Sequence, residues 1–173
     1  DNRVVEQMID STMDAQLQRT EIQKQGEVSV LSKLDGQSDF NFVFDYSPDF
    51  YKGIVGLLAT RVVQNHHVPS FIGAVIEDKI VGSSRAPKGQ NLLESCEYSM
   101  ELLNKFGGHH QAAGFELPLE NAHAFKTKLQ EFYQDKKPAE NKQEFDFEAE
   151  LFELDVTFKK WLKKLEPYGV GFP

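Results

Sequence analysis

A continuous apolar run at residues 71–76, Phe-Ile-Gly-Ala-Val-Ile, constrains the fold more than any other feature of the sequence. A run of this kind is typical of a strand that is buried on both faces. Asp78 and Lys79 follow as a turn, and residues 80–86 return as the partner strand. Because such a hairpin needs other elements to cover both of its faces, we expect a layered α/β protein.

Apolar periodicity on either side of this hairpin predicts the covering elements. Residues 40–46 alternate as a strand with one aromatic face, and residues 115–117 extend a further strand. Apolar residues recur at helical spacing in four other segments, at residues 2–25, 53–66, 91–105 and 119–133. Gly26 is expected to end the first of these helices. The predicted fold class is therefore α/β, with a mixed β-sheet of about four or five strands covered by helices.

The C-terminal part has a pattern of its own. Residues 136–143 are charged and contain Pro138, so we expect the domain boundary there. Residues 145–151 then alternate as a half-exposed strand, and residues 158–165 form a short helix. The sequence thus predicts a strand-helix extension after the sheet domain.

The net charge of −8 argues against a broad basic groove for nucleic acid. The acidic residues are concentrated at residues 140–155, which hold seven carboxylates and one lysine. Residues 53–115 are balanced, with five basic and five acidic residues. A nucleic acid bound there would therefore contact the protein through a few phosphates.

Cysteine content and hydropathy indicate the compartment. Cys96 is the single cysteine, which excludes an internal disulfide, and its place in a helical pattern predicts a buried packing thiol. No apolar run approaches the ~18 residues of a membrane span, and the first residues carry no secretory signal. We therefore expect a cytoplasmic protein without a membrane partner.

Residues 106–114, Phe-Gly-Gly-His-His-Gln-Ala-Ala-Gly, combine little side-chain bulk with two histidines. Gly107 and Gly108 let a phosphate or another backbone come close. In an extended segment His109 and His110 point to opposite faces, so we expect one of them at a cleft. This pattern predicts a backbone cradle with one histidine for an anion such as phosphate. The alternative is a glycine turn that ends the preceding helix and packs against a neighbour.

A second candidate site lies at the end of the predicted hairpin. Ser83 and Arg85 are two residues apart and share a face of their strand, whereas Ser84 points away. A hydroxyl and a guanidinium on one face form a phosphate clamp, although pairing of Arg85 with a nearby glutamate is the alternative. Gly53 and Gly56 lie at the start of the helix predicted over residues 53–66. Glycines at this position indicate a close neighbour or a bound anion at that helix end.

Four segments in order resemble the DHHA1 domain, the second domain of DHH-family phosphoesterases. The resemblance is to the form carried by RecJ-type single-strand-specific DNA exonucleases. The matching segments are residues 53–61 (GIVGLLATR), 82–85 (GSSR), 106–114 (FGGHHQAAG) and 165–171 (LEPYGVG). Tyr51 departs from the family pattern, which usually has histidine there, and Phe172 stands where asparagine is usual.

The resemblance implies a domain organisation and a set of site residues. Residues 1–38 correspond to a connector helix and linker, 39–137 to the DHHA1 domain, and 138–173 to the start of an oligonucleotide-binding region that we expect to continue beyond this chain. In RecJ-type enzymes the residues matching Ser83 and Arg85 grip the 5′ end of the strand, and the residue matching His109 contacts phosphate. The residues expected to bind the phosphates of single-stranded DNA are Arg61, Ser83, Arg85, Gly107, Gly108 and His109.

The resemblance also implies where the chemistry occurs. No Asp-His-His triplet is present, and aspartates spaced to hold two metal ions are missing. We therefore expect no catalytic or metal-ligating residue in this segment, which should cleave nothing by itself. The Mn²⁺ or Mg²⁺ ions of the family belong to the DHH domain, which is absent from this chain.

The predicted function is that of the substrate-binding DHHA1 part of a RecJ-like 5′-to-3′ single-stranded DNA exonuclease, acting in DNA repair and recombination. Its expected partners are single-stranded DNA and the missing DHH and OB domains. One alternative within the superfamily is part of an oligoribonuclease or nucleotide phosphatase. The other is a non-catalytic nucleotide-binding module.

Overall fold

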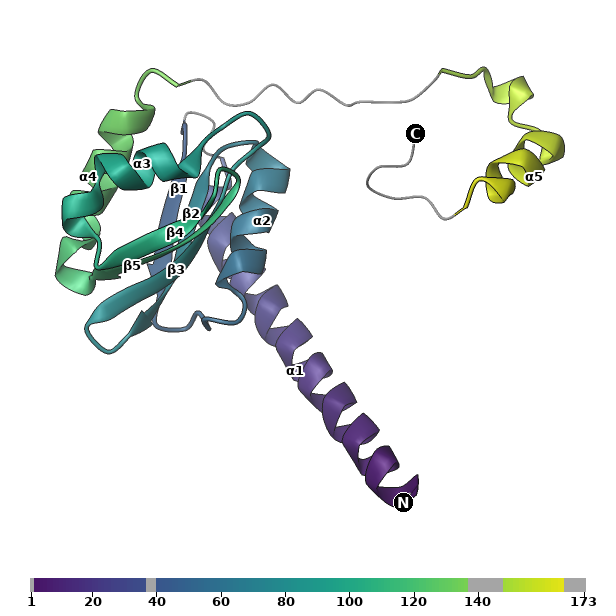
Figure 1. Ribbon diagram of the computed structural model, residues 1–173, viewed down its shortest axis with the longest axis horizontal. Helices are drawn as coiled ribbons and strands as arrows, with labels where there is room; N and C mark the ends of the chain where they lie inside the picture. Colours follow the sequence, from purple (N-terminus) through teal and green to yellow (C-terminus); the bar gives the residue numbers. More distant parts are fainter. Residues whose placement is uncertain (1, 37–39, 137–147, 167–173) are drawn as a thin grey trace. The chain divides into compact units, whose positions relative to one another are not determined.

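The computed structural model describes residues 2–36, 40–136 and 148–166, in two compact units, Asp1–Glu140 and Asn141–Pro173. The first unit holds a five-stranded sheet in the order β1-β2-β3-β5-β4. The strands are β1 (Val43–Ser47), β2 (Ser70–Ile76), β3 (Lys79–Arg85), β4 (Lys105–His109) and β5 (Ala112–Pro118). β1 is parallel to β2 and the other neighbours are antiparallel, which confirms the predicted mixed α/β sheet (Figure 1).

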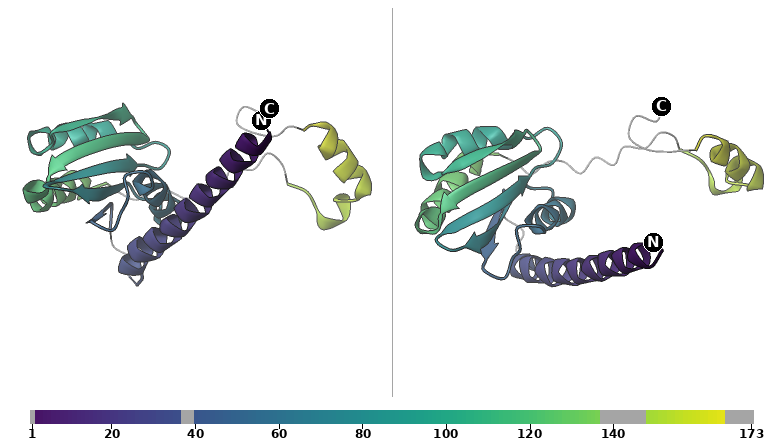
Figure 2. Two further views of the ribbon diagram at one scale, coloured as in Figure 1. Left: turned by 90° about the horizontal axis from the view of Figure 1, so that it is seen from below. Right: turned by 60° about the horizontal axis from the view of Figure 1, so that its bottom comes forward.

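Helices cover both faces of this sheet, as the buried hairpin required. One face carries α2 (Val55–His66) and the C-terminal part of α1 (Asn2–Leu34), and the other carries α3 (Leu92–Tyr98) and α4 (Ala122–Tyr133) (Figures 1 and 2). β2 is buried along its first five residues because it supplies side chains to both layers. Ile72 lies in the core under α2, and Phe71 lies in the core under α3 and α4.

α1 is longer than predicted, because Gly26 does not end it. The helix continues to Leu34, and Gly26 is buried in its interior. A Cβ atom placed on Gly26 would lie 3.1 Å from Cδ1 of Leu58 and 3.3 Å from Cδ1 of Ile54. The glycine therefore lets α1 approach α2 closely, and the predicted stop was wrong because a packing glycine was interpreted as a cap.

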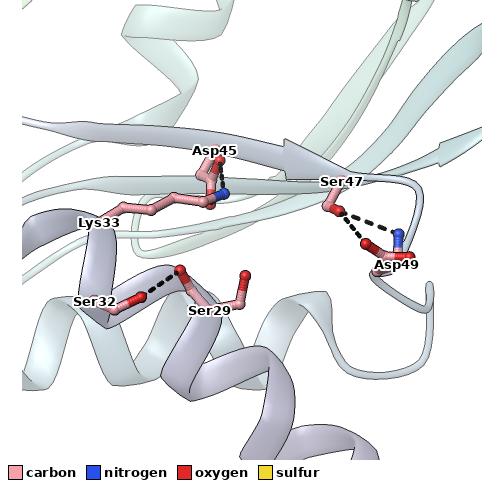
Figure 3. Close-up of polar contacts among 6 residues, drawn as sticks. All are labelled: Ser29, Ser32, Lys33, Asp45, Ser47 and Asp49. Carbon is pink, nitrogen blue, oxygen red and sulfur yellow. Dashed lines mark hydrogen bonds and ion pairs between the residues drawn. The ribbon is translucent and has the colours of Figure 1, made fainter.

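Polar contacts join the end of α1 to β1. Nζ of Lys33 lies 2.9 and 2.8 Å from the two carboxylate oxygens of Asp45 (Figure 3). At the end of β1, Oγ of Ser47 accepts a hydrogen bond from the amide of Asp49 at 3.1 Å (Figure 3). The Lys33–Asp45 pair joins the C-terminal end of α1 to β1, whereas the apolar residues Val5, Met8 and Leu17 near the start of α1 are exposed.

The helix predicted over residues 91–105 is shorter than expected. α3 ends at Tyr98, a 3₁₀ turn follows at Met100–Leu102, and β4 begins at Lys105. The Ser99 hydroxyl donates to the carbonyl of Ser95 at 2.7 Å, and such local bonds compete with helix continuation. Met100, in this 3₁₀ turn, is 61% exposed.

Later elements confirm some predictions and correct others. The helix predicted at residues 119–133 is a 3₁₀ turn, Leu119–Asn121, followed by α4. In the second unit α5 (Val156–Lys164) confirms the short helix. The predicted strand over residues 145–151 is wrong where it is described, because Leu151–Glu153 is a 3₁₀ turn, and residues 145–147 lie outside the described residues.

Other predictions fall largely on residues that are not described. The linker predicted at 136–143 and the motif at 165–171 belong to this group. Within the described ranges no helix is both long and apolar enough to cross a membrane.

Candidate functional site

The part of the sheet face on the α2 side that β5 and β4 form is not covered by that helix. α2 packs over β2 and β3, whereas on β5 and β4 the same face is exposed at Gly114, Gly107 and His109. Ser83 belongs to this face, because its register partner Ile72 lies in the core under α2. We call the α2 side of β3, β5 and β4 the open face.

Strand register arranges the open face in three rows. The first row holds Arg85, Ala112 and His109. The second holds Ser83, Gly114 and Gly107, and the third holds Val81, Glu116 and Lys105. Rows of this kind are about 7 Å apart along the strands, and neighbouring strands are about 4.8 Å apart.

The rows bring four of the predicted site residues onto one face: Ser83, Arg85, Gly107 and His109. The shared face of Ser83 and Arg85 is confirmed. Ser84 points into the opposite core, where it is fully buried and donates a hydrogen bond to the carbonyl of Ala113 at 3.1 Å.

A pocket of about 420 Å³ lies over the second and third rows. Its floor includes Val81, Ser83, Gly107 and Gly114, and one wall comes from Lys52 and Val55 at the start of α2. Lys52 and Lys105 are the charged residues among those that line it. A chain with a net charge of −8 thus presents a pocket whose charged lining is positive.

Arg85 lies beside this pocket at the first turn of α2. Its Nη1 donates to the carbonyl of Ser84 at 2.8 Å. A Cβ atom placed on Gly56 would lie 3.0 Å from Nη2 of Arg85 and 3.5 Å from Oγ of Ser83. The close neighbour predicted at this helix start is therefore the Arg85 side chain. Gly53 has open space around it.

Arg85 does not have the glutamate partner that the alternative prediction required. No carboxylate within the described part of the chain pairs with its guanidinium. The side chain is half-buried, and its hydrogen bond to the carbonyl of Ser84 uses one of the five donors of a guanidinium. The remaining donors and the Ser83 hydroxyl are near each other on the open face, an arrangement suited to a phosphate group.

Glu116 in the third row pairs with two lysines, Lys105 of the same row and Lys79 at the start of β3. Its carboxylate accepts from Lys105 at 3.2 Å and from Lys79 at 3.4 Å, and the residue is 8% exposed. The hydrogen bond from Lys105, followed by that from Lys79, holds the pKa of Glu116 below its ordinary value. The negative charge on the open face is therefore paired, and Lys105 is held beside the pocket.

The histidines lie at the tip of the β4–β5 hairpin. His109 ends β4, and His110 and Gln111 form the turn that follows. The carbonyl of His110 accepts a hydrogen bond from the amide of Leu92 at 2.8 Å, and the carbonyl of Gln111 accepts one from the amide of Ala86 at 3.1 Å. Both imidazoles are exposed and border one shallow hollow. The expected separation to opposite faces is wrong, because His110 is in a turn and not in an extended strand.

Gly107 and Gly108 do not form the helix-ending turn of the alternative interpretation, because both belong to β4. Gly108 has a φ of 148°, and a Cβ atom there would clash with the carbonyl oxygen of Ala112 and with Cα of Ala113. Around Gly107 there is nothing within 4 Å of a Cβ, and around Gly114 only two backbone oxygens at 3.8 and 4.0 Å. The hairpin therefore requires Gly108, whereas Gly107 and Gly114 keep the pocket floor bare.

Arg61 lies apart from these residues. It is exposed on α2, with Nε 3.1 Å from Oε1 of Glu27 on α1 and Nη1 3.2 Å from Oε1 of Gln64. This ion pair links the two helices. A role for Arg61 in binding substrate stays a prediction.

Sequence reasoning missed Lys52, Lys105, Gly114 and Glu116. The signal for Lys105 and Gly107 was their spacing of two, which places both on one face once residues 105–109 are recognised as a strand. Gly114 and Glu116 share this spacing on β5. Helical periodicity assigned residues up to 105 to a helix, so the strand pattern was not recognised.

Other titratable groups are structural. Burial raises the pKa of the Cys96 thiol to about 11, which confirms the packing thiol and makes it a poor nucleophile at neutral pH. Burial likewise raises the pKa of Tyr133 to about 12. In the described ranges no group of three or more His, Cys, Asp or Glu side chains is placed to hold a metal ion.

Comparison with known proteins defines the class. A family model described as the DHHA1 domain matches residues 39–135, which is more than half of the chain. The chain therefore belongs to the DHHA1 domain family. Within it the similarity is to the domain carried by RecJ, as the four sequence motifs predicted.

The RecJ relatives are named single-stranded-DNA-specific exonucleases. Those of Thermus thermophilus and Bacillus subtilis are 30% and 29% identical over 152 and 126 residues, covering 85% and 70% of this chain. A crystal structure of RecJ from Thermus thermophilus in complex with Mn²⁺ matches with a TM-score of 0.74 at 25% identity over 91% of this chain. The chain spans 22% and 16% of the two relatives and 23% of the crystallised chain.

Proposed function

We propose that this DHHA1 domain is the substrate-binding part of a RecJ-like 5′-to-3′ single-stranded DNA exonuclease that acts in DNA repair and recombination. The observation that carries the proposal is Arg85, which lies beside Ser83 on the open face and lacks a carboxylate partner in the described part of the chain. The names of the RecJ relatives support the substrate class.

The open face would grip the end of the strand as follows. Arg85 offers parallel N–H donors to two oxygens of a phosphate, and Ser83 adds a hydroxyl donor from the next row. Gly56 leaves the room at the start of α2 that the guanidinium needs. His109, in the same row as Arg85, supplies a further donor near the hairpin tip. These contacts recognise phosphate and orient the strand without acting on it chemically.

Hydrolysis is assigned to a DHH domain outside this chain. Solved RecJ structures contain Mn²⁺ or Mg²⁺, whereas the described residues here do not offer the carboxylate and histidine set that such ions need. We expect the isolated chain to be inactive as a nuclease. The DHH and oligonucleotide-binding domains are its proposed partners.

The test is binding of a 5′-phosphorylated oligothymidylate at low salt, followed by fluorescence anisotropy. Arg85→Ala should weaken binding by about 1 to 3 kcal/mol, and so should removal of the 5′-phosphate. The two losses should not add, because both remove the same contact.

Lys126→Ala is the matched control, since it removes one positive charge from α4 on the other side of the sheet. Equal losses in Arg85→Ala and Lys126→Ala would contradict a specific clamp. Stronger competition by RNA or free nucleotides than by DNA would favour the oligoribonuclease or nucleotide-phosphatase alternative.

A further inference from the structure

The pocket beside Arg85 has cations that the proposed end clamp does not use. Arg85 is in the first row of the open face, and Lys105 is in the third row, two strands away. The outer rows are about 13 Å apart along the strands, given two residues per row. One phosphate gripped by Arg85 and Ser83 therefore leaves Lys105 available to a different group.

Lys105 is held in a defined place. Its ammonium is 3.2 Å from the carboxylate of Glu116, which is largely buried in the third row. Glu116 also accepts from Lys79, so two lysines share one negative charge and the cluster keeps a net positive charge. The Lys105 side chain itself is 73% exposed, so its remaining donors are accessible from the pocket.

Lys52 adds a second cation on the opposite wall. It is exposed, and within the described ranges it forms no hydrogen bond or ion pair. Between the two lysines the floor is bare at Gly107 and Gly114, although neither glycine is needed for packing. A strand of nucleic acid could therefore lie against the backbone here and bring a phosphate between the two ammonium groups.

We propose that Lys105 and Lys52 bind a second phosphate of the strand whose terminal phosphate Arg85 and Ser83 grip, with Glu116 positioning the Lys105 ammonium. This inference rests on the proposed function. It assigns the pocket to the internucleotide phosphate of a nucleic-acid strand, and so extends the site from one phosphate to two.

The experiment compares ligands that differ by one nucleotide, so that the longer one carries a single additional phosphate, and the Lys105 variant separates the contribution of that phosphate from that of the added nucleoside. The 173-residue chain is titrated with 5′-phosphorylated thymidine and with 5′-phosphorylated dithymidylate, and binding is followed by NMR chemical shifts. The dinucleotide should bind the native chain more tightly. Lys105→Ala should weaken the affinity for the dinucleotide roughly three- to fivefold and leave the affinity for the mononucleotide unchanged.

Salt dependence gives a second readout. The slope of log K against log salt for a 5′-phosphorylated oligothymidylate should become shallower by about 0.7 in Lys105→Ala, because one phosphate contact is lost. Gly107→Ala should weaken the dinucleotide while leaving the melting temperature equal to or above that of the native chain. Lys126→Ala should change neither ligand.

The outcomes separate the two proposals. If Lys105→Ala weakens both ligands equally, Lys105 belongs to the Arg85 phosphate and the second subsite is wrong. If the native chain gains nothing from the second phosphate, or Lys105→Ala changes nothing, the second subsite is also overturned. Failure of the proposed function looks different, because then Arg85→Ala leaves mononucleotide binding unchanged.

Discussion

Individual residues on the open face differ in whether packing requires them, and their immediate neighbours show which do. Gly108 has a positive φ and backbone atoms where a side chain would be, so the hairpin needs it. Gly107, one residue earlier, has neither restriction. Because Gly107 has no side chain, the pocket floor is bare at this position. The two adjacent glycines of the motif therefore differ physically: Gly108 is required by the backbone of the hairpin, and Gly107 leaves space in the pocket.

Glu116 gives a prediction for acid stability. Its pKa in the folded chain is below the ordinary value of 4.5, so the folded state binds fewer protons than the unfolded state near that pH. The ion pairs with Lys105 and Lys79 therefore contribute stability above pH 4.5, and this contribution is lost as the pH falls through the lowered pKa.

We expect the free energy of unfolding, measured by urea denaturation from about pH 6 to pH 3, to fall less steeply in Glu116→Gln than in the native chain. Glu120→Gln is the control, because Glu120 is exposed and has no ion pair among the described residues. Identical pH profiles for the native chain and Glu116→Gln would show that the lysine pairs do not stabilise the fold.

At the scale of elements, two close approaches position the site. Gly56 in α2 admits the Arg85 side chain from β3, and Gly26 in α1 admits Leu58 of α2. The second approach fixes α2 between α1 and the sheet, together with Val30 and Val62 of the same core. The position of α2 in turn sets the space left for the Arg85 guanidinium.

This contact predicts a position-specific effect of helix mutations. Gly26→Leu should destabilise the fold by about 1 to 3 kcal/mol, because the added side chain overpacks the α1–α2 contact. Lys24→Leu, at an exposed position two residues earlier, should be nearly neutral. Thermal unfolding of both variants measures the difference, and equal melting temperatures would mean that α1 does not pack on α2 in solution.

For the whole molecule, charge sets the binding regime. The net charge is −8, and the cations on the open face and on the wall of its pocket are few: Lys52, Lys79, Arg85 and Lys105. The proposed attraction to nucleic acid would therefore be confined to one small area, in contrast to a protein with a basic groove. In the proposed complex, the orientation of the strand would depend on the geometry around Arg85 and Ser83 more than on long-range attraction.

We expect a shallow salt dependence as a result. The slope of log K against log salt for a longer single strand should be about −1.4 to −2.1, which corresponds to two or three phosphate contacts at ~0.7 each. Anisotropy titrations between about 50 and 200 mM salt measure this slope. A slope steeper than about −4 would indicate a broad basic interface and contradict this account.

The sequence by itself determined the features that depend on backbone periodicity. The strand at the apolar run of residues 71–76 and the return strand follow from the local pattern of residues. The shared face of Ser83 and Arg85 follows from the two-residue repeat of a strand. The ordered motifs were also sufficient to identify the family. Local spacing is enough for these features because each depends only on neighbours along the chain.

Only the tertiary structure decided which distant residues meet. The register of β3, β5 and β4 placed His109 and Gly107 in the same rows as Arg85 and Ser83. The packing of α2 on α1 placed Arg61 elsewhere, in an ion pair with Glu27. The roles of Gly26 and Gly56 depend on side chains of other elements. Such contacts result from the packing of segments that are far apart in the chain, so the local pattern of residues does not encode them.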